Sequence, residues 1–411
     1  MNKKHLRLAA TVAAIALGAS LAGCSSGGSS EDSIIIWYRP GSLPDASVEG
    51  VKAQFPDADI TLIQTPDVDT KLQAALRSNS GIPDMAVATL PLYASVFDKF
   101  LDVNEYGFED VADEYVEWKV QGQQSDGRQV GIPIDIGPNG FVYRADIFES
   151  LGLPSEPDDV TAALSTWEGY EEIAKTVREE QGGYVCDVAT SIYLHSMLSE
   201  GYALSTDDVQ NPEPDLENPI NQESFERALT IGQEDLCLGF GAYTQEWAAA
   251  VAQDTLVGYI GPAYVNAQLI AAGEPSAGNW RVAQAPAGFS SNFGSNLSVF
   301  KATKNPELAT EIAIWLTNAE NQAAGYETNG LFPSTIASYS MSELTQPEDF
   351  FGGQVTAEIF GQIAEQSPVA PRSPLSETQS AVFQEAINDA ILSGTDPTEA
   401  FEAALKAAQD L

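Results

Sequence analysis

Between residues 34 and 90, short apolar runs rich in β-branched residues alternate with amphipathic segments. IIIWY (34–38), ITLIQ (60–64) and MAVATL (85–90) have the composition of strands. Between them, VEGVKAQFP (48–56) and KLQAALRS (71–78) space their apolar residues as helices do. The order strand, helix, strand, helix, strand predicts a parallel sheet with helices on its faces, so we expect an α/β fold class.

The first of these strands ends at RPGS (39–42), which has the composition of a turn and places Arg39 in a loop. Successive side chains of a strand point to opposite faces of its sheet. We therefore expect Trp37 to point into the core and Tyr38 to point away from it.

The stretch from 129 to 154, QVGIPIDIGPNGFVYRADIFESLGLP, contains two strand-like runs that Pro138, Asn139 and Gly140 should interrupt. Such a break fits a crossover between two lobes. Further along, QGGYVCDVAT (181–190) is typical of another strand, and KNPELATEIAIWLTN (304–318) predicts a helix with Asn305 as its N-cap and Pro306 in its first turn.

The N-terminus has the pattern of an export signal. Lys3, Lys4 and Arg7 precede LAATVAAIALGA (8–19), an apolar run too short to cross a bilayer. LAGC (21–24) resembles a lipobox and a Ser/Gly tract follows it, so we expect a lipoprotein signal peptide over 1–23, a lipid on Cys24 and a flexible tether over 24–31. The alternative is an ordinary signal peptide with a chance cysteine.

The composition narrows the possible functions. The formal net charge is −40, and such a field repels nucleic acid and anionic lipid. The only histidines are His5 and His195, and the chain contains no CxxC, HExxH, GxSxG or P-loop sequence. We therefore expect no cofactor, no metal and no catalysis, with His195 as a hydrogen-bonded residue of a core. Cys186 and Cys237 remain after Cys24, and an even pair in an exported protein suggests one disulfide, with two buried thiols as the alternative.

Five stretches in this order carry a resemblance to a known family. The chain resembles the extracellular solute-binding lipoproteins of ABC importers, in the sugar-binding, maltose-binding-protein-like branch. The stretches are SGIPDMAVATL (80–90), VGIPIDIGPNGFVYRADIFESLGLP (130–154), TWEGYEEIAKTV (166–177), LVGYIGPAYV (256–265) and FGSNLSVFKATKNPELATEIAIWLTNAENQAAGYETNGLFPS (293–334).

The resemblance implies a periplasmic-binding-protein-like fold with two α/β lobes joined by three crossovers, near 135–140, 285–290 and 317–320. Lobe one would comprise 32–137 and 287–318, and lobe two 138–286 and 319–411. A neutral carbohydrate would bind in the cleft between the lobes and pass to a membrane permease. The protein would be a monomer, anchored by lipid on the extracytoplasmic face of the bacterial membrane.

A sugar site needs flat aromatic rings beside planar polar groups, because sugars combine weakly polar C–H faces with hydroxyl edges. Arg39 and Arg372 are also explained by surface ion pairs, Trp247 by burial, and Ala263 stands where sugar-binding relatives often carry an aromatic residue after Gly-Pro. The candidates for ligand contact are Tyr38, Arg39, Asp135, Trp247, Tyr264, Asn292, Phe293 and Arg372.

Two other functions remain open from the sequence. A lipid-anchored glycoside hydrolase would need two carboxyl groups about 5 to 9 Å apart across one pocket. The chain has 59 acidic residues, but no short motif selects such a pair. A binding protein for a polyamine or a peptide would keep the fold and use the acidic balance to attract a cation.

Overall fold

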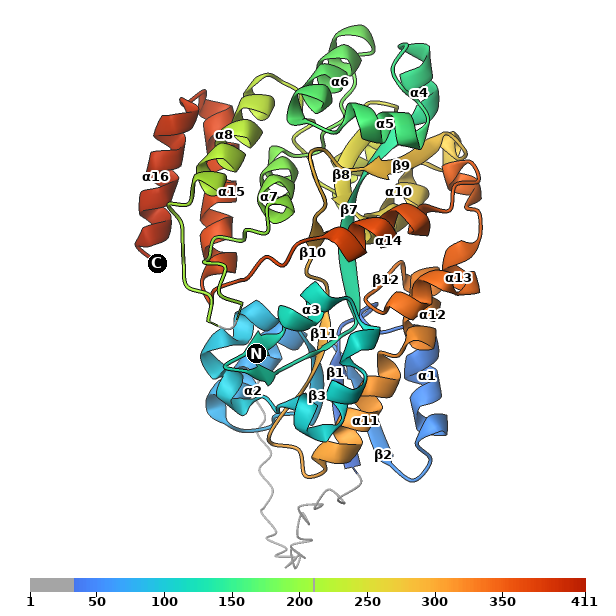
Figure 1. Cartoon of the computed structure of the whole chain (residues 1–411), viewed down its shortest axis with the longest axis vertical. Helices are drawn as coiled ribbons and strands as arrows, with labels where there is room; N and C mark the ends of the chain where they lie inside the picture. The colour runs from blue at the N-terminus through green and yellow to red at the C-terminus, as the bar shows by residue number, and fades with distance from the viewer. Residues whose placement is uncertain (1–32, 210) are drawn as a thin grey trace, which may run out of the picture.

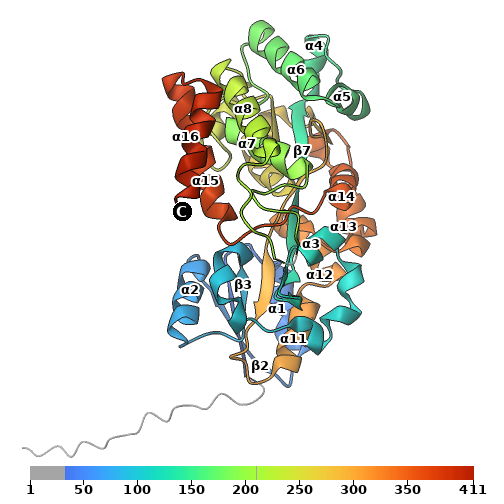
Figure 2. The ribbon, with the colours of Figure 1, turned by 60° about the vertical axis from the view of Figure 1, so that its left-hand side comes forward.

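The computed structural model describes residues 33–209 and 211–411, which form two lobes stacked along the long axis (Figure 1). The predicted signal peptide, the predicted lipid site Cys24 and the predicted tether lie outside the described residues. Within the described part of the chain, no helix is both long and apolar enough to cross a membrane. Figure 2 shows the same two bodies from the side, joined where β7 passes between them.

Lobe one is built on a sheet with the strand order β2-β1-β3-β11-β6. The first three strands are parallel, and β11 runs antiparallel between β3 and β6. Hydrophobic clusters cover both faces of this sheet. The predicted strand and helix alternation is thus confirmed, with β1 Ser33–Tyr38, α1 Asp45–Gln54, β2 Asp59–Gln64, α2 Val68–Ser78, β3 Met85–Ala88, α3 Glu117–Gln121, β4 Gln124–Ser125, β5 Arg128–Gln129, β6 Ile132–Pro133, β11 Asn296–Val299 and α11 Pro306–Leu316.

Lobe two surrounds β7 (Asp135–Arg144), which pairs antiparallel with β8 on one side and β9 on the other. One face of these strands packs against α7, α8, α15 and α16, and the other against α9, α10 and α14 (Figure 1). The remaining bounds are α4 Ala145–Ser150, α5 Pro157–Ala163, α6 Trp167–Glu180, α7 Ala189–Ser199, α8 Pro219–Gln233, α9 Gln245–Ala252, β8 Gly258–Pro262, α10 Asn266–Ala272, β9 Trp280–Gln284, β10 Ser291–Asn292, α12 Ala319–Asn329, β12 Phe332–Pro333, α13 Ser342–Thr345, α14 Thr356–Gln366, α15 Ser376–Ser393 and α16 Pro397–Gln409.

The chain passes between the lobes at three places. It leaves the first sheet after β6 and enters the second at β7, and it returns between β10, which pairs with β7, and β11, which pairs with β3. The third passage lies between α11 and α12. The start of α11 is as predicted, because the Asn305 side chain accepts a hydrogen bond from the Leu308 amide at 3.2 Å and Pro306 occupies the first turn.

The predicted break at Pro138–Gly140 is wrong, because β7 runs through it as one strand. Gly137 and Gly140 do not form a turn, and each leaves space for a side chain from another element. A Cβ at Gly137 would lie 2.8 Å from Tyr264 Cε1, and a Cβ at Gly140 would lie 2.9 Å from Phe360 Cε1. Side chains from two other elements therefore pack directly onto the strand backbone.

The expected orientation is wrong for Tyr38, while Trp37 packs against a hydrophobic core cluster as expected. Tyr38, only 8% exposed, lies in the core with Ile34 and Ile36, whereas Trp37 is partly buried on the opposite face of the sheet. The side chains do alternate, but β1 lies between β2 and β3 in a sheet covered on both sides. Alternation therefore cannot indicate which face is the core when both faces are buried.

Only part of the strand expected at 181–190 forms, as a parallel bridge between Tyr184 and Leu256. Cys186 and Cys237 are joined by a disulfide with their Cα atoms 4.5 Å apart. Beside it, the Leu238 amide donates to the Cys186 carbonyl at 2.9 Å and the Gly239 amide donates to the Asp187 carbonyl at 2.8 Å. The disulfide and these bonds fix the loop before α9 against the end of the bridge.

Candidate functional site

The site lies between the lobes, where the ends of several strands meet. β1 and β3 of lobe one end there just before Arg39 and Thr89, and β8 of lobe two ends there two residues before Tyr264. The loops after the carboxyl ends of strands in an α/β sheet are the usual place for a ligand. Polar side chains of both lobes therefore lie in this region.

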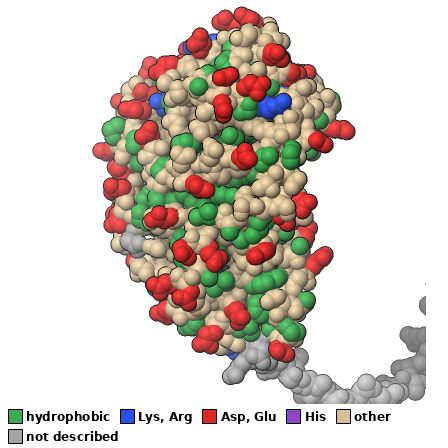
Figure 3. Space-filling view, turned by 45° about the vertical axis from the view of Figure 1, so that its right-hand side comes forward, with side chains coloured by type: hydrophobic (Ala, Val, Ile, Leu, Met, Phe, Trp, Pro, Cys, Tyr) green, Lys and Arg blue, Asp and Glu red, His purple; other side chains and the backbone are tan. Residues whose placement is uncertain are grey.

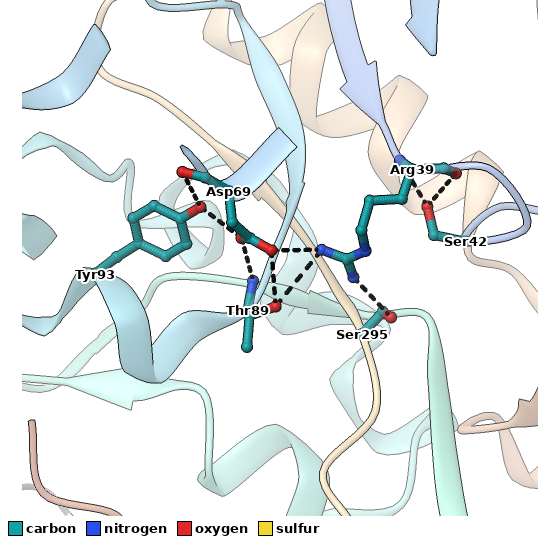
Figure 4. Close-up of polar contacts among 6 residues, drawn as sticks. All are labelled: Arg39, Ser42, Asp69, Thr89, Tyr93 and Ser295. Carbon is teal, nitrogen blue, oxygen red and sulfur yellow. Dashed lines mark hydrogen bonds and ion pairs between the residues drawn. The ribbon is translucent and has the colours of Figure 1, made fainter. Parts of the chain in front are cut away.

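Arg39 is the centre of a network within lobe one (Figure 4). Its Nη1 forms an ion pair with Asp69 Oδ2 at 2.9 Å, and its Nη2 donates to Ser295 Oγ at 3.3 Å. The other oxygen of Asp69 accepts a 2.6 Å hydrogen bond from the Tyr93 hydroxyl, and Thr89 also donates to Asp69. The guanidinium is therefore held in place and its charge is balanced, while about a quarter of the side chain stays exposed.

Asp135 and Lys119 are buried beside this network. The Ser295 amide donates to Asp135 Oδ1 at 2.7 Å, and Lys119 Nζ donates to the Phe293 carbonyl and lies 4.0 Å from the centre of the Phe293 ring. Burial raises the pKa of Asp135 and lowers the pKa of Lys119 to about 7, and the attraction between the two charges opposes both shifts. Together the two side chains hold the second passage between the lobes.

Gly294 sits between these anchors in the left-handed region, with φ +69°. A Cβ at this position would lie 2.1 Å from the Asp135 carbonyl oxygen. Only glycine both adopts this conformation readily and leaves room for β7. The two crossing segments are therefore in direct backbone contact.

Tyr264 and Asn292 lie on the lobe-two side of the same region. Asn292 Nδ2 donates to the Tyr264 hydroxyl at 3.0 Å, and the Tyr264 ring rests on Gly137. Burial raises the pKa of Tyr264, and the charge of Asp135 raises it further. The tyrosine thus reaches the crossing strands although Ala263, and not Tyr264, directly follows Gly-Pro.

A cavity between the lobes adjoins this network. Its inner part, about 60 Å³, lies between residues 90–130 of lobe one and the described residues Val209, Pro212 and 370–373 of lobe two. Its outer part, about 540 Å³, shares Phe97, Gln124, Pro212 and Arg372 with the inner one. The described residues that line the inner part are Leu90, Phe97, Gly122, Gln123, Gln124, Val130, Val209, Pro212, Phe293, Ala370, Pro371, Arg372 and Ser373.

The structure brings together five of the eight candidates: Arg39, Asp135, Tyr264, Asn292 and Phe293. Arg372 lines the cavity from lobe two and forms an ion pair with Glu377 at 2.6 Å. Tyr38 and Trp247 lie apart from them in hydrophobic cores, Trp247 with its ring against Tyr259.

His195 is buried between Ser290 Oγ at 2.6 Å and the Pro286 carbonyl at 2.7 Å. Burial lowers its pKa to about 4.

Sequence reasoning missed Lys119, Asp69, Gln123 and Asp187. Lys119 has one available signal, since it is a rare positive charge within EWKVQ, a short segment otherwise suited to a surface helix. Asp187 lies within the segment predicted as a strand, and burial raises its pKa to about 7. Gln123 carries no signal, because its neighbours in space come from distant parts of the chain.

A model of the family described as bacterial extracellular solute-binding protein matches residues 46–352. An arabinooligosaccharide-binding protein of Halalkalibacterium halodurans is 30% identical over 171 residues, which cover 39% of this chain and 37% of that protein. A lactose-binding protein of Rhizobium radiobacter is 29% identical over 147 residues, covering 33% of this chain and 32% of that protein.

The aligned parts thus span about a third of the length of these two relatives. Among solved structures, an extracellular solute-binding protein of family 1 superposes with a TM-score of 0.84 at 24% identity, covering 92% of this chain and 99% of the other. That similarity shows the two-lobed fold. Since the family model matches well over half of the sequence, the chain belongs to the bacterial extracellular solute-binding proteins.

Proposed function

We propose that this protein binds a neutral carbohydrate between its lobes, releases it unchanged and delivers it to the permease of an ABC importer. The observation that carries the proposal is the balance of charge in the cleft. Arg39 is paired with Asp69, Arg372 with Glu377, and Lys119 lies within the field of Asp135. The inner part of the cavity then offers amides, a hydroxyl and aromatic rings, from Gln124, Ser373 and Phe293 among others, which suits an uncharged sugar.

The two alternative functions fit this lining less well. A polyamine would need unpaired carboxylates, and a glycoside hydrolase would need two carboxyl groups across the pocket. Among the residues that the structure describes, no Asp or Glu lines the inner part of the cavity, and the outer part has Asp126 and Glu213 in its lining. The names of the two relatives, which bind an arabinooligosaccharide and lactose, add support for a sugar.

Calorimetry against mono- and oligosaccharides, polyamines and peptides tests the proposal, with chromatography of the recovered ligand. We expect one or more neutral sugars to bind and to be recovered intact. Selective binding of a polyamine would contradict the sugar assignment, and a hydrolysed sugar would show that the protein is an enzyme.

Tyr264→Ala is expected to weaken sugar binding by about 1 to 3 kcal/mol, because it removes the aromatic ring that lies on the crossing strands beside Gly137 and Asn292. Tyr264→Phe is the matched control, since it keeps the ring and loses only the hydroxyl bonded to Asn292. It should retain most of the affinity. Equal affinity of the alanine variant and the unmodified protein in calorimetry would remove Tyr264 from the site.

The same proposal includes a lipid anchor on Cys24 at the extracytoplasmic face of the membrane. In cells that produce Cys24→Ala, the protein should leave the membrane fraction for the medium or remain as uncleaved precursor, because the modified thiol is gone. Fractionation and immunoblotting measure this distribution. A normally processed variant that stays in the membrane fraction would rule the anchor out.

A further inference from the structure

Among the described residues, only two aromatic side chains are exposed, and both lie on one loop. Phe240 is 46% exposed and Tyr243 is 64% exposed, in GFGAYT (239–244) directly before α9. The other aromatic rings of the described chain are at least partly buried. This loop is therefore the place where the described chain leaves aromatic surface in contact with solvent.

Tyr243 also has a strained backbone. Its φ of +72° lies in the left-handed region, which bulky side chains rarely adopt. Its side chain does not offset this strain, because it belongs to neither hydrophobic cluster of lobe two and forms no hydrogen bond with the described residues. Strain without a stabilising contact is typical of positions that contact a ligand.

The loop that carries Tyr243 is held at both ends. The disulfide between Cys186 and Cys237 fixes the segment before it. At its other end, Thr244 Oγ1 caps α9 by accepting a hydrogen bond from the Trp247 amide at 3.2 Å. The ring of Tyr243 is therefore presented on an ordered backbone, which lowers the entropy lost when a ligand binds.

The loop lies at the end of β8 that faces the cleft. α9 ends beside the start of that strand, where the Leu256 amide donates to the Ala250 carbonyl at 3.0 Å. In the first turn of α9, the Trp247 ring contacts the Tyr259 ring, and the Tyr259 ring extends along β8 onto Gly261. Helix and strand thus run in opposite directions, so the start of α9 lies beside the end of β8.

Tyr243 is close to the polar groups already described at this end of lobe two. Burial raises the pKa of Tyr264, and the charges of Asp135 and Tyr243 raise it further, while the Tyr264 hydroxyl accepts a hydrogen bond from Asn292. Desolvation raises the pKa of Tyr243 as well, although its side chain is mostly exposed. An open ring with protein around its hydroxyl overhangs a recess in the surface.

We propose that Tyr243 is a ligand-contact residue of lobe two, and that its ring stacks on the C–H face of a sugar ring bound beside Tyr264 and Asn292. Ala263, directly after Gly-Pro, supplies no ring at the end of β8, and Tyr243 supplies one from the neighbouring loop. The strained backbone directs the ring outward, where the sugar covers it. This inference rests on the proposed function, because it assigns a further residue to the same cleft.

Tyr243→Asn tests the inference, because asparagine removes the ring and tolerates the left-handed region. Calorimetry with lactose, maltotriose and arabinotriose measures binding. For each sugar that the unmodified protein binds, we expect the variant to lose about fivefold or more in affinity, the scale of part of one aromatic ring uncovered. Its melting temperature should stay the same or rise by about 2 °C, because the backbone strain is relieved.

Tyr243→Phe is the matched control, since it keeps the ring and removes only the hydroxyl. It should bind the same sugars within about twofold of the unmodified protein. Unchanged affinity of Tyr243→Asn, an equal loss in Tyr243→Phe, or a loss accompanied by a clear fall in melting temperature would overturn the inference and leave the proposed function standing. If none of the three sugars binds the unmodified protein, both fail.

Discussion

Replacing Cys186 and Cys237 together by alanine is expected to lower the free energy of unfolding by about 4 kcal/mol. The disulfide joins residues separated by 51 positions, and a loop of that length has much conformational entropy in the unfolded chain that the bond removes. Urea unfolding of the protein without residues 1–24, followed by tryptophan fluorescence, measures the change.

The reduced parent protein provides the control for this variant. It should unfold near the same urea concentration as the double-alanine variant, because both lack the constraint. An alanine variant as stable as the oxidised parent would mean that the bond contributes nothing to stability.

Gly294→Ala is expected to lower the free energy of unfolding by about 3 kcal/mol or more. A side chain in the left-handed region costs about 1 to 2 kcal/mol, and here the new Cβ would also meet the Asp135 carbonyl oxygen at 2.1 Å. Since that contact is backbone against backbone, relief requires the second passage to move away from β7.

Gly394→Ala separates the two contributions. Gly394 has the same φ of +69°, but nothing lies within 4 Å of the position of its Cβ. The free energy of unfolding of this variant should fall by only about 1 to 2 kcal/mol. If urea unfolding shows the same decrease in the free energy of unfolding for both variants, the contact between the crossing segments does not contribute to stability.

The overall fold could be predicted from the sequence, because the patterns that indicate its strands and helices lie within short stretches of the chain. The alternation of apolar runs predicted the parallel strands β1, β2 and β3, and the Asn305-Pro306 pair predicted the start of α11. The interruption expected at Pro138–Gly140 failed for a non-local reason. Glycine there makes room for Tyr264 and Phe360, which are more than 100 residues away in sequence.

The site could be predicted only in part, because some of its residues are placed by contacts with distant parts of the chain. Arg39 and Tyr264 could be expected from the rule that loops after strands carry ligands. Lys119 and Gln123 follow no strand, and their surroundings come from residues near 293 and 371. Their burial depends on how the lobes meet, which no short stretch of sequence encodes.

Acidic side chains are scattered over the face of the molecule seen in Figure 3, with few basic ones between them. The cleft differs, because each of the three cations considered there has an acidic neighbour. The large negative charge is therefore a property of the exterior, where it favours solubility, and it does not describe the ligand.

The position of β11 in the first sheet has a consequence for synthesis on the ribosome. This strand lies between β3 and β6, yet it follows β6 by most of lobe two in the chain. At 5 to 20 residues per second, roughly 10 to 30 s pass between the emergence of β6 and that of β11. During this time β3 has one unpaired edge, which is a site for wrong pairing or for a chaperone. The nascent chain must therefore remain soluble with its first sheet incomplete until Val299 has been made.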